Sequence, residues 1–437
     1  MEVRTTILAA VAAFGVAAIV SRIDLRGQPA TPVDAAAPRA PLDAAGAVYD
    51  DVLAVLDRSI AAQRKRADGR PTDWLTRMHL GQRLLERASL TNRFDDYARV
   101  QAVLDETYTI IRPGIGPLLL GARFNFAIHR LAAAEEYLHH LDNVAVPRAD
   151  DVIAARLLRA QIAMQRGQYA EALEGFTAVE RAAGVFAYPE LAAYHARTGR
   201  PDAAVELLAA ALAATTKKDP QRRAWLRLQL GIVAMERGEL APAMQHFRDA
   251  DAELKGWWLV QEHIAEIHHR RSNHAEAIAM LEALVRTSEL PQHMDALAGL
   301  YRHTGEPDRA NEWIARAAAK WDEQLARFPE AATGHALQHH LQFGAPERAL
   351  ELALANVALR PGGDAQVSLA RAYLQAGRAA EALAVADKVL ATPYRTARLH
   401  DVAEKAHAAL GHTAAAEEQA ALRLALNPFY SSEDHSH

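Results

Sequence analysis

Ten alanines recur along the chain at intervals of 32 to 39 residues, each near the start of an apolar segment that follows a turn. The clearest stand in the stretches YAEAL and AAEAL. The ten are Ala98, Ala133, Ala172, Ala204, Ala243, Ala277, Ala310, Ala349, Ala382 and Ala416. A helix, a turn and a second helix repeated with a period in the thirties indicate stacked helix pairs that are buried only against their neighbours. The sequence therefore predicts an all-α solenoid of about ten helix pairs.

The unit at residues 363–393 shows the pattern most fully. Ala370 lies on the first helix, and Gly377 interrupts the chain. Ala382 and Ala386 then lie four residues apart on the second helix. Small side chains are needed at such positions, because two helices approach closely only where no bulky side chain separates them. The recurring alanines are therefore predicted to be contact points within the stack.

These units resemble the tetratricopeptide repeat. In that family Leu followed by Gly or Ala stands in the first helix, and Ala, an aromatic residue or Leu, and Ala stand in the second. A close match is made by Leu230, Gly231, Gly238, Ala243, Phe247 and Ala250. The resemblance covers residues 71–427 and is weakest in the first two units and the last. It implies a right-handed α-solenoid and a non-catalytic scaffold that binds a protein or peptide partner in a concave groove.

The flanking segments differ from the repeats in composition. Residues 1–22 contain an uncharged, mostly aliphatic run behind Arg4, which predicts a signal-anchor helix or a cleaved signal peptide. Residues 23–46 are predicted to be a Pro/Ala-rich linker, residues 47–70 an N-terminal capping helix, and residues 428–437 a polar tail. This order predicts a single-pass protein of the inner (cytoplasmic) membrane with a periplasmic solenoid. Cleavage would instead leave a secreted or periplasmic protein.

The composition narrows the function classes. The net charge is −5, from 49 basic and 54 acidic residues, so no basic excess indicates nucleic-acid binding. The chain contains no cysteine, which excludes disulfides, thiol catalysis and thiolate metal sites. The sequence has no nucleotide-binding, serine-hydrolase or zinc-protease motif. We therefore expect a protein that is not an enzyme and uses no cofactor.

The resemblance also assigns the residues of the groove, because certain first-helix positions face inward in this family. The N-terminal part of the predicted groove is apolar, and the C-terminal part is mixed in charge. The apolar set is Leu118, Phe126, Leu157, Met164, Trp225, Leu228 and Met235. The polar set is Glu262, Glu266, His269, Arg270, Asp295, Arg302 and His303. Such a groove suits an amphipathic helix or an extended peptide, and we expect a role in assembling an envelope complex.

Histidine is the unusual residue type, with 20 in the chain. Two alternative functions stay open beside the scaffold. One is a His-rich metal-handling accessory protein of the envelope, in which His269, His303 and Glu266 bind the metal, with Glu262 and Asp295 close to them. The other is an oligomeric structural subunit that assembles through its convex face or an edge.

Overall fold

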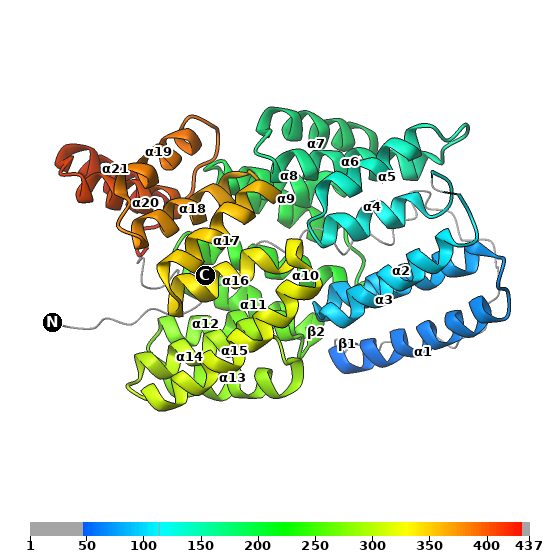
Figure 1. Ribbon diagram of the computed structural model, residues 1–437, viewed down its shortest axis with the longest axis horizontal. Coiled ribbons are helices and arrows are strands. Elements are labelled where there is room, and N and C mark those ends of the chain that lie inside the picture. Colours follow the sequence, from blue (N-terminus) through cyan, green and yellow to red (C-terminus); the bar gives the residue numbers. More distant parts are fainter. Residues whose placement is uncertain (1–46, 113, 431–437) are drawn as a thin grey trace.

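The computed structural model describes residues 47–112 and 114–430 (Figure 1). The predicted signal-anchor helix at 1–22, the linker at 23–46 and the tail beyond residue 430 lie outside the described residues and stay predictions. Among the described helices, none is both long and apolar enough to cross a lipid bilayer.

The described chain is almost entirely helical. After a first helix, α1, the helices form ten consecutive packed pairs, from α2 with α3 to α20 with α21, which confirms the predicted all-α array of about ten pairs. The helices are α1 (Tyr49–Asp68), α2 (Trp74–Thr91), α3 (Phe94–Tyr108), α4 (Leu118–Ala127), α5 (Leu131–Asp142), α6 (Ala149–Gln165), α7 (Tyr169–Ala183), α8 (Tyr188–Arg197), α9 (Pro201–Ala214), α10 (Pro220–Glu236), α11 (Leu240–Glu253), α12 (Trp258–Arg270), α13 (His274–Ser288), α14 (Pro291–His303), α15 (Pro307–Arg327), α16 (Pro329–Phe343), α17 (Pro346–Leu359), α18 (Gly363–Gln375), α19 (Ala379–Leu390), α20 (Ala397–Ala409) and α21 (Thr413–Leu426). A short 3-10 helix η1 (Gly184–Ala187) and two-residue strands β1 (Ala47–Val48) and β2 (Leu254–Lys255) complete the described elements.

A glycine in the left-handed conformation ends the first helix of several pairs. After α18, Gly377 has a φ of 72°, and the Arg378 N–H donates to the carbonyl oxygen of Tyr373 at 2.8 Å. This bond gives a partner to a carbonyl that the helix end would otherwise leave unsatisfied. The chain then reverses, and α19 packs back against α18.

Seven of the ten recurring alanines have no exposed surface, as expected of contact points. They are Ala172, Ala204, Ala243, Ala277, Ala310, Ala349 and Ala382. In the first two pairs the positions predicted from the spacing, Ala98 and Ala133, are wrong, because the fully buried residues are their neighbours Val100 and Ala134. The turns of these two units depart from the repeat pattern, so the spacing did not locate the start of the second helix.

The array forms a superhelix of two stacked turns. The turn inside each of the first five pairs contacts the connection that follows the pair five units farther along the chain. The bonds that define this inter-turn contact are Arg93 Nη2 to Glu289 Oε2 (3.8 Å), Arg130 Nε to Glu330 Oε1 (3.3 Å), Gly362 N–H to the Gln165 carbonyl (2.9 Å), Arg395 N–H to the Arg197 carbonyl (2.8 Å) and Asn427 Nδ2 to the Glu236 carbonyl (2.9 Å). Helix α18 therefore lies beside α8 in Figure 1, and Arg197 and Asp364 join the two helices by an ion pair of 3.5 Å.

The N-terminal end of the described chain is tied to the start of the second turn. Strand β1 pairs in parallel with β2, which lies between α11 and α12. The carbonyl oxygen of Leu90, at the end of α2, accepts hydrogen bonds from Tyr49 Oη at 3.1 Å and from Trp258 Nε1 at 2.8 Å. Leu56 and Ile60 of α1 are buried, and α1 packs along α2. Through these contacts α1 and the strand before it are attached to both turns of the superhelix.

Candidate functional site

The apolar residues predicted for the groove are buried inside the array. Leu118 and Phe126 lie in a small core built by α4, α5 and α6. The main core contains Leu157, Trp225, Leu228 and Met235, with the half-buried Met164 packed against it. These side chains pack helices against one another. A partner could contact them only if the helices that cover them moved apart. Their role in partner binding stays a prediction.

The acidic residues predicted on α12 are also buried, and each faces a basic group. Arg270 Nη2 lies 2.8 Å from Glu266 Oε1, one helical turn away. His263 Nδ1 lies 3.5 Å from the other Glu266 oxygen, and His293 Nε2 lies 3.7 Å from Glu262 Oε2. A buried carboxylate is costly unless it is paired, and the contact with Arg270 explains how the array accommodates Glu266. Their partners belong to the chain itself.

Asp295 joins three consecutive helices of the second turn. Its carboxylate accepts a hydrogen bond from Trp321 Nε1 of α15 at 2.7 Å, and it lies 2.6 Å from His339 Nδ1 of α16. Burial raises the pKa of Asp295, and the two hydrogen bonds act in the opposite direction. Arg302, two helical turns farther along α14, stacks over the ring of Phe343 at 4.9 Å. Asp295 therefore has a structural role in this state, and Arg302 keeps some exposed surface.

Three histidines from the ends of three helices converge at one edge of the array. His269 lies in the last turn of α12, His274 opens α13 and His303 ends α14. One nitrogen of each ring lies within 4.8 Å of a nitrogen of the other two, and the Nδ1 atoms of His269 and His274 are 3.2 Å apart. The structure thus brings together two of the three ligands of the alternative metal hypothesis, whereas Glu266 pairs with Arg270. Sequence reasoning missed His274, although its place five residues after His269, across a turn, was a usable signal.

The surroundings of His269 and His274 favour the neutral form of both rings. Burial, followed by the neighbouring rings of His303 and His274, lowers the pKa of His269 to about 4. Burial and His303 also lower the pKa of His274. His269 is buried, His274 half-buried and His303 exposed, so the cluster opens to solvent on the His303 side. Neutral imidazole is the form of histidine that can coordinate a metal ion.

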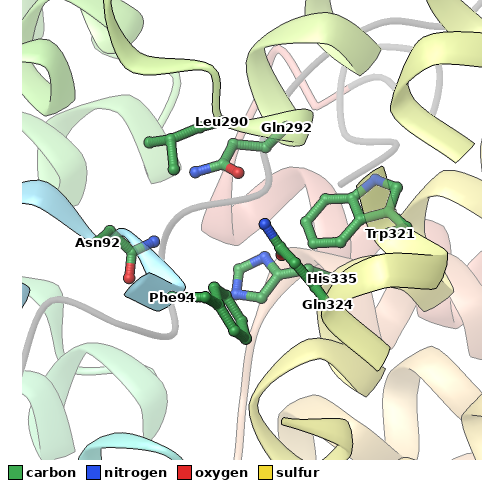
Figure 2. Close-up of a pocket in the computed structure, with 7 residues that line it drawn as sticks. All are labelled: Asn92, Phe94, Leu290, Gln292, Trp321, Gln324 and His335. Atoms are coloured by element: carbon green, nitrogen blue, oxygen red, sulfur yellow. The ribbon is translucent and has the colours of Figure 1, made fainter. Parts of the chain in front are cut away.

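A small pocket lies between the two superhelical turns (Figure 2). Its lining residues are Asn92, Phe94, Leu290, Gln292, Trp321, Gln324 and His335. The rings of Trp321 and His335 are stacked, with centroids 5.8 Å apart and planes at 3°. The free volume of the pocket, about 10 Å³, is close to what one water molecule needs, so the pocket does not suit an organic ligand. No sequence signal indicated this pocket, because its walls come from four separate segments.

The repeat residues and the ten packed helix pairs together decide the fold. It is an α-solenoid of helix pairs that resemble tetratricopeptide repeats. No family model matches the sequence, and no curated protein matches it.

Several solved structures are similar in fold at low sequence identity. A tetratricopeptide repeat protein from Parabacteroides merdae is 19% identical, with 57% of this chain and 94% of that chain covered and a TM-score of 0.34. The thermophilic protein TTC0263 of Thermus thermophilus is 20% identical, with 45% and 99% covered and a TM-score of 0.34. A monomeric mutant of IFIT1 with m7Gppp-AAAA is 12% identical, with 81% and 90% covered and a TM-score of 0.41.

Proposed function

We propose that this protein is a non-catalytic scaffold that binds a partner protein at the open C-terminal end of its array. The observation that carries the proposal is the exposure of α21. Helix α19, the second helix of the preceding pair, buries Ala382, Val385, Ala386 and Val389, because α20 packs over it. Helix α21 buries none of its residues completely. In a solenoid the terminal helix normally carries a polar outer face, so an apolar one indicates a contact surface.

The chemistry of α21 indicates the kind of partner. Leu422 and Leu424 are 42% and 44% exposed, and they flank a strip that contains the exposed Ala421. Glu417 and Glu418 are exposed one turn earlier on the same helix. A helix packs closely over small residues, and acidic neighbours favour basic groups on the partner. The partner surface is therefore an amphipathic helix with an apolar stripe beside lysine or arginine, which continues the stacking of the array.

Site-directed crosslinking from α21 tests this proposal. We expect a photo-crosslinking residue in place of Ala421 to capture a defined partner, and Leu422→Glu with Leu424→Glu to abolish that product without lowering the melting temperature. Val146→Glu is the matched control, because Val146 is also exposed but lies in the connection between α5 and α6. Unchanged crosslinks in the double variant would overturn the proposal. Crosslinks to a second copy of the chain, with a doubled mass in light scattering, would instead support the oligomeric structural subunit.

We also propose that residues 1–22 direct the chain to the inner membrane and that the solenoid lies in the periplasm. The support is the uncharged aliphatic run at residues 5–20, which approaches the length of a membrane span. A reporter active only outside the cytoplasm, fused after residue 430, should be active in the full chain and inactive when residues 1–22 are deleted. Activity that survives the deletion would reject this location signal.

A further inference from the structure

The convergence of His269, His274 and His303 is independent of the surface on α21. The three residues belong to helices of two adjacent pairs, α12–α13 and α14–α15. Their rings lie edge to face or tilted, with centroid separations of 5.2 Å for His269 and His274, 5.1 Å for His269 and His303, and 4.7 Å for His274 and His303. None of the three pairs is stacked face to face. One nitrogen of each ring lies within 4.8 Å of a nitrogen of the other two rings.

The distances fit a tetrahedral metal ion after a small adjustment. Zinc–nitrogen bonds of about 2.0–2.1 Å at tetrahedral angles place two ligand nitrogens about 3.3 Å apart. The Nδ1 atoms of His269 and His274 already lie 3.2 Å apart. A nitrogen of His303 lies within 4.8 Å of a nitrogen of each of the other two rings. Because His303 is the exposed member, rotation of its side chain can close the remaining gap of at most about 1.5 Å without disturbing the core.

We propose that His269, His274 and His303 bind one divalent transition-metal ion, Zn²⁺ first among them. Three imidazole ligands are the donor set of zinc sites that keep a fourth position open, and the exposed side of His303 leaves that position to water or a partner group. The cationic side chain of Arg270, next to His269 in the chain, lies 2.8 Å from Glu266, which compensates its charge. Glu266 therefore forms an ion pair with Arg270 and is not one of the proposed metal ligands.

The bound ion would join the end of α12, the start of α13 and the end of α14. His269 and His274 bracket the turn inside one pair, and His303 ends the first helix of the next pair. Coordination therefore fixes the angle between two consecutive pairs in the second turn. Metal binding to the folded form alone raises stability by mass action.

Zinc titration of the full chain tests the site. Because His435 and His437 in the tail could also bind metal, every variant carries His435→Asn and His437→Asn. We expect one Zn²⁺ per chain in calorimetry, with micromolar or tighter affinity, and a zinc-dependent rise in melting temperature. His303→Ala, whose side chain is exposed, should weaken binding by about 100-fold or more. Co²⁺ in place of zinc should give the intense visible absorption of a tetrahedral nitrogen site.

His412→Ala is the matched control. His412 pairs with His407 across the α20–α21 turn, with Nδ1 atoms 3.3 Å apart, but no third histidine joins them within the described residues. This variant should bind zinc as the parent does. Absence of binding at micromolar zinc, or equal affinity in the parent and in His303→Ala, would overturn the proposal. If no partner is crosslinked from α21 but zinc still binds, the proposed scaffold function is rejected and the metal site stands.

Discussion

Substitution of Gly362 by alanine probes the inter-turn contact at its closest backbone approach. Gly362 lies in the connection between α17 and α18, and its N–H donates to the carbonyl oxygen of Gln165, in the other superhelical turn, at 2.9 Å. A β-carbon at this position would lie 2.7 Å from that oxygen and 3.1 Å from the Met164 carbonyl oxygen. The φ of Gly362 is −69°, which any residue adopts, so the effect of alanine is steric and not conformational.

The magnitude follows from these distances. An ordinary contact needs at least 3.4 Å, so the two turns must separate by about 0.7 Å at this point. The same movement stretches the hydrogen bond from 2.9 Å to about 3.6 Å, beyond useful length. Loss of a buried hydrogen bond costs about 1 kcal/mol, and overpacking adds about 1–3 kcal/mol. We therefore expect Gly362→Ala to lower the free energy of unfolding by about 2–4 kcal/mol.

Urea unfolding followed by circular dichroism measures this change. The control is Gly69→Ala in the C-cap of α1, where a β-carbon meets only ordinary contacts of 3.4 and 3.7 Å and φ is −73°. That control should be neutral or slightly stabilising, because alanine restricts the unfolded chain. If Gly362→Ala unfolds at the same urea concentration as the control, the two superhelical turns do not touch as described, and the reasoning fails.

Two further substitutions test buried polar groups. Glu190, only 3% exposed on α8, has its pKa raised to about 8, chiefly by burial, from 4.5. Between these two pH values the folded state holds a proton that the unfolded state releases. The contribution of Glu190 to the free energy of unfolding is therefore fully present below pH 4.5. It is lost as the pH rises to 8, and the loss is at most about 5 kcal/mol. Glu190→Gln should flatten this loss in unfolding measured at pH 5 and pH 8; an unaltered pH profile would contradict it. Asp295→Asn should lower the free energy of unfolding at pH 7 by about 2–3 kcal/mol, because Trp321 and His339 contact different oxygens of the carboxylate and the amide replaces one of them by an NH2 group; an unchanged urea midpoint would reject that role.

Most of the fold could be predicted because its determinants are local. Each pair is specified by a glycine turn and by small residues at fixed offsets, and both signals lie within one unit. Gly377 and Ala382 illustrate this, since the first reverses the chain and the second is fully buried where the helices meet. The predicted contact positions were wrong at Ala98 and Ala133. The glycine turn is absent there, so spacing alone had to locate the second helix.

The candidate site was less predictable, because burial depends on contacts between distant units. The inward positions of Trp225 and Leu228 were assigned from their place in the repeat, but nothing in the repeat shows that other helices cover them. His269 and His303 could be named from equivalent positions in neighbouring units. His274 was missed because it stands at the start of a second helix, outside the positions that face the groove, although it follows His269 across a single turn.

Each inter-turn contact joins two units that are five pairs apart, so these contacts depend on the number of pairs between them. A simple solenoid accepts the gain or loss of one unit at any point, since each unit meets only its neighbours. Here the loss of a single pair from the middle would set every turn of the first five pairs against the wrong connection. Gly362 would no longer face the carbonyl of Gln165, and Asn427 would no longer reach Glu236. Duplication and deletion of units, the usual route by which repeat proteins change, are therefore restricted in this chain to its two ends.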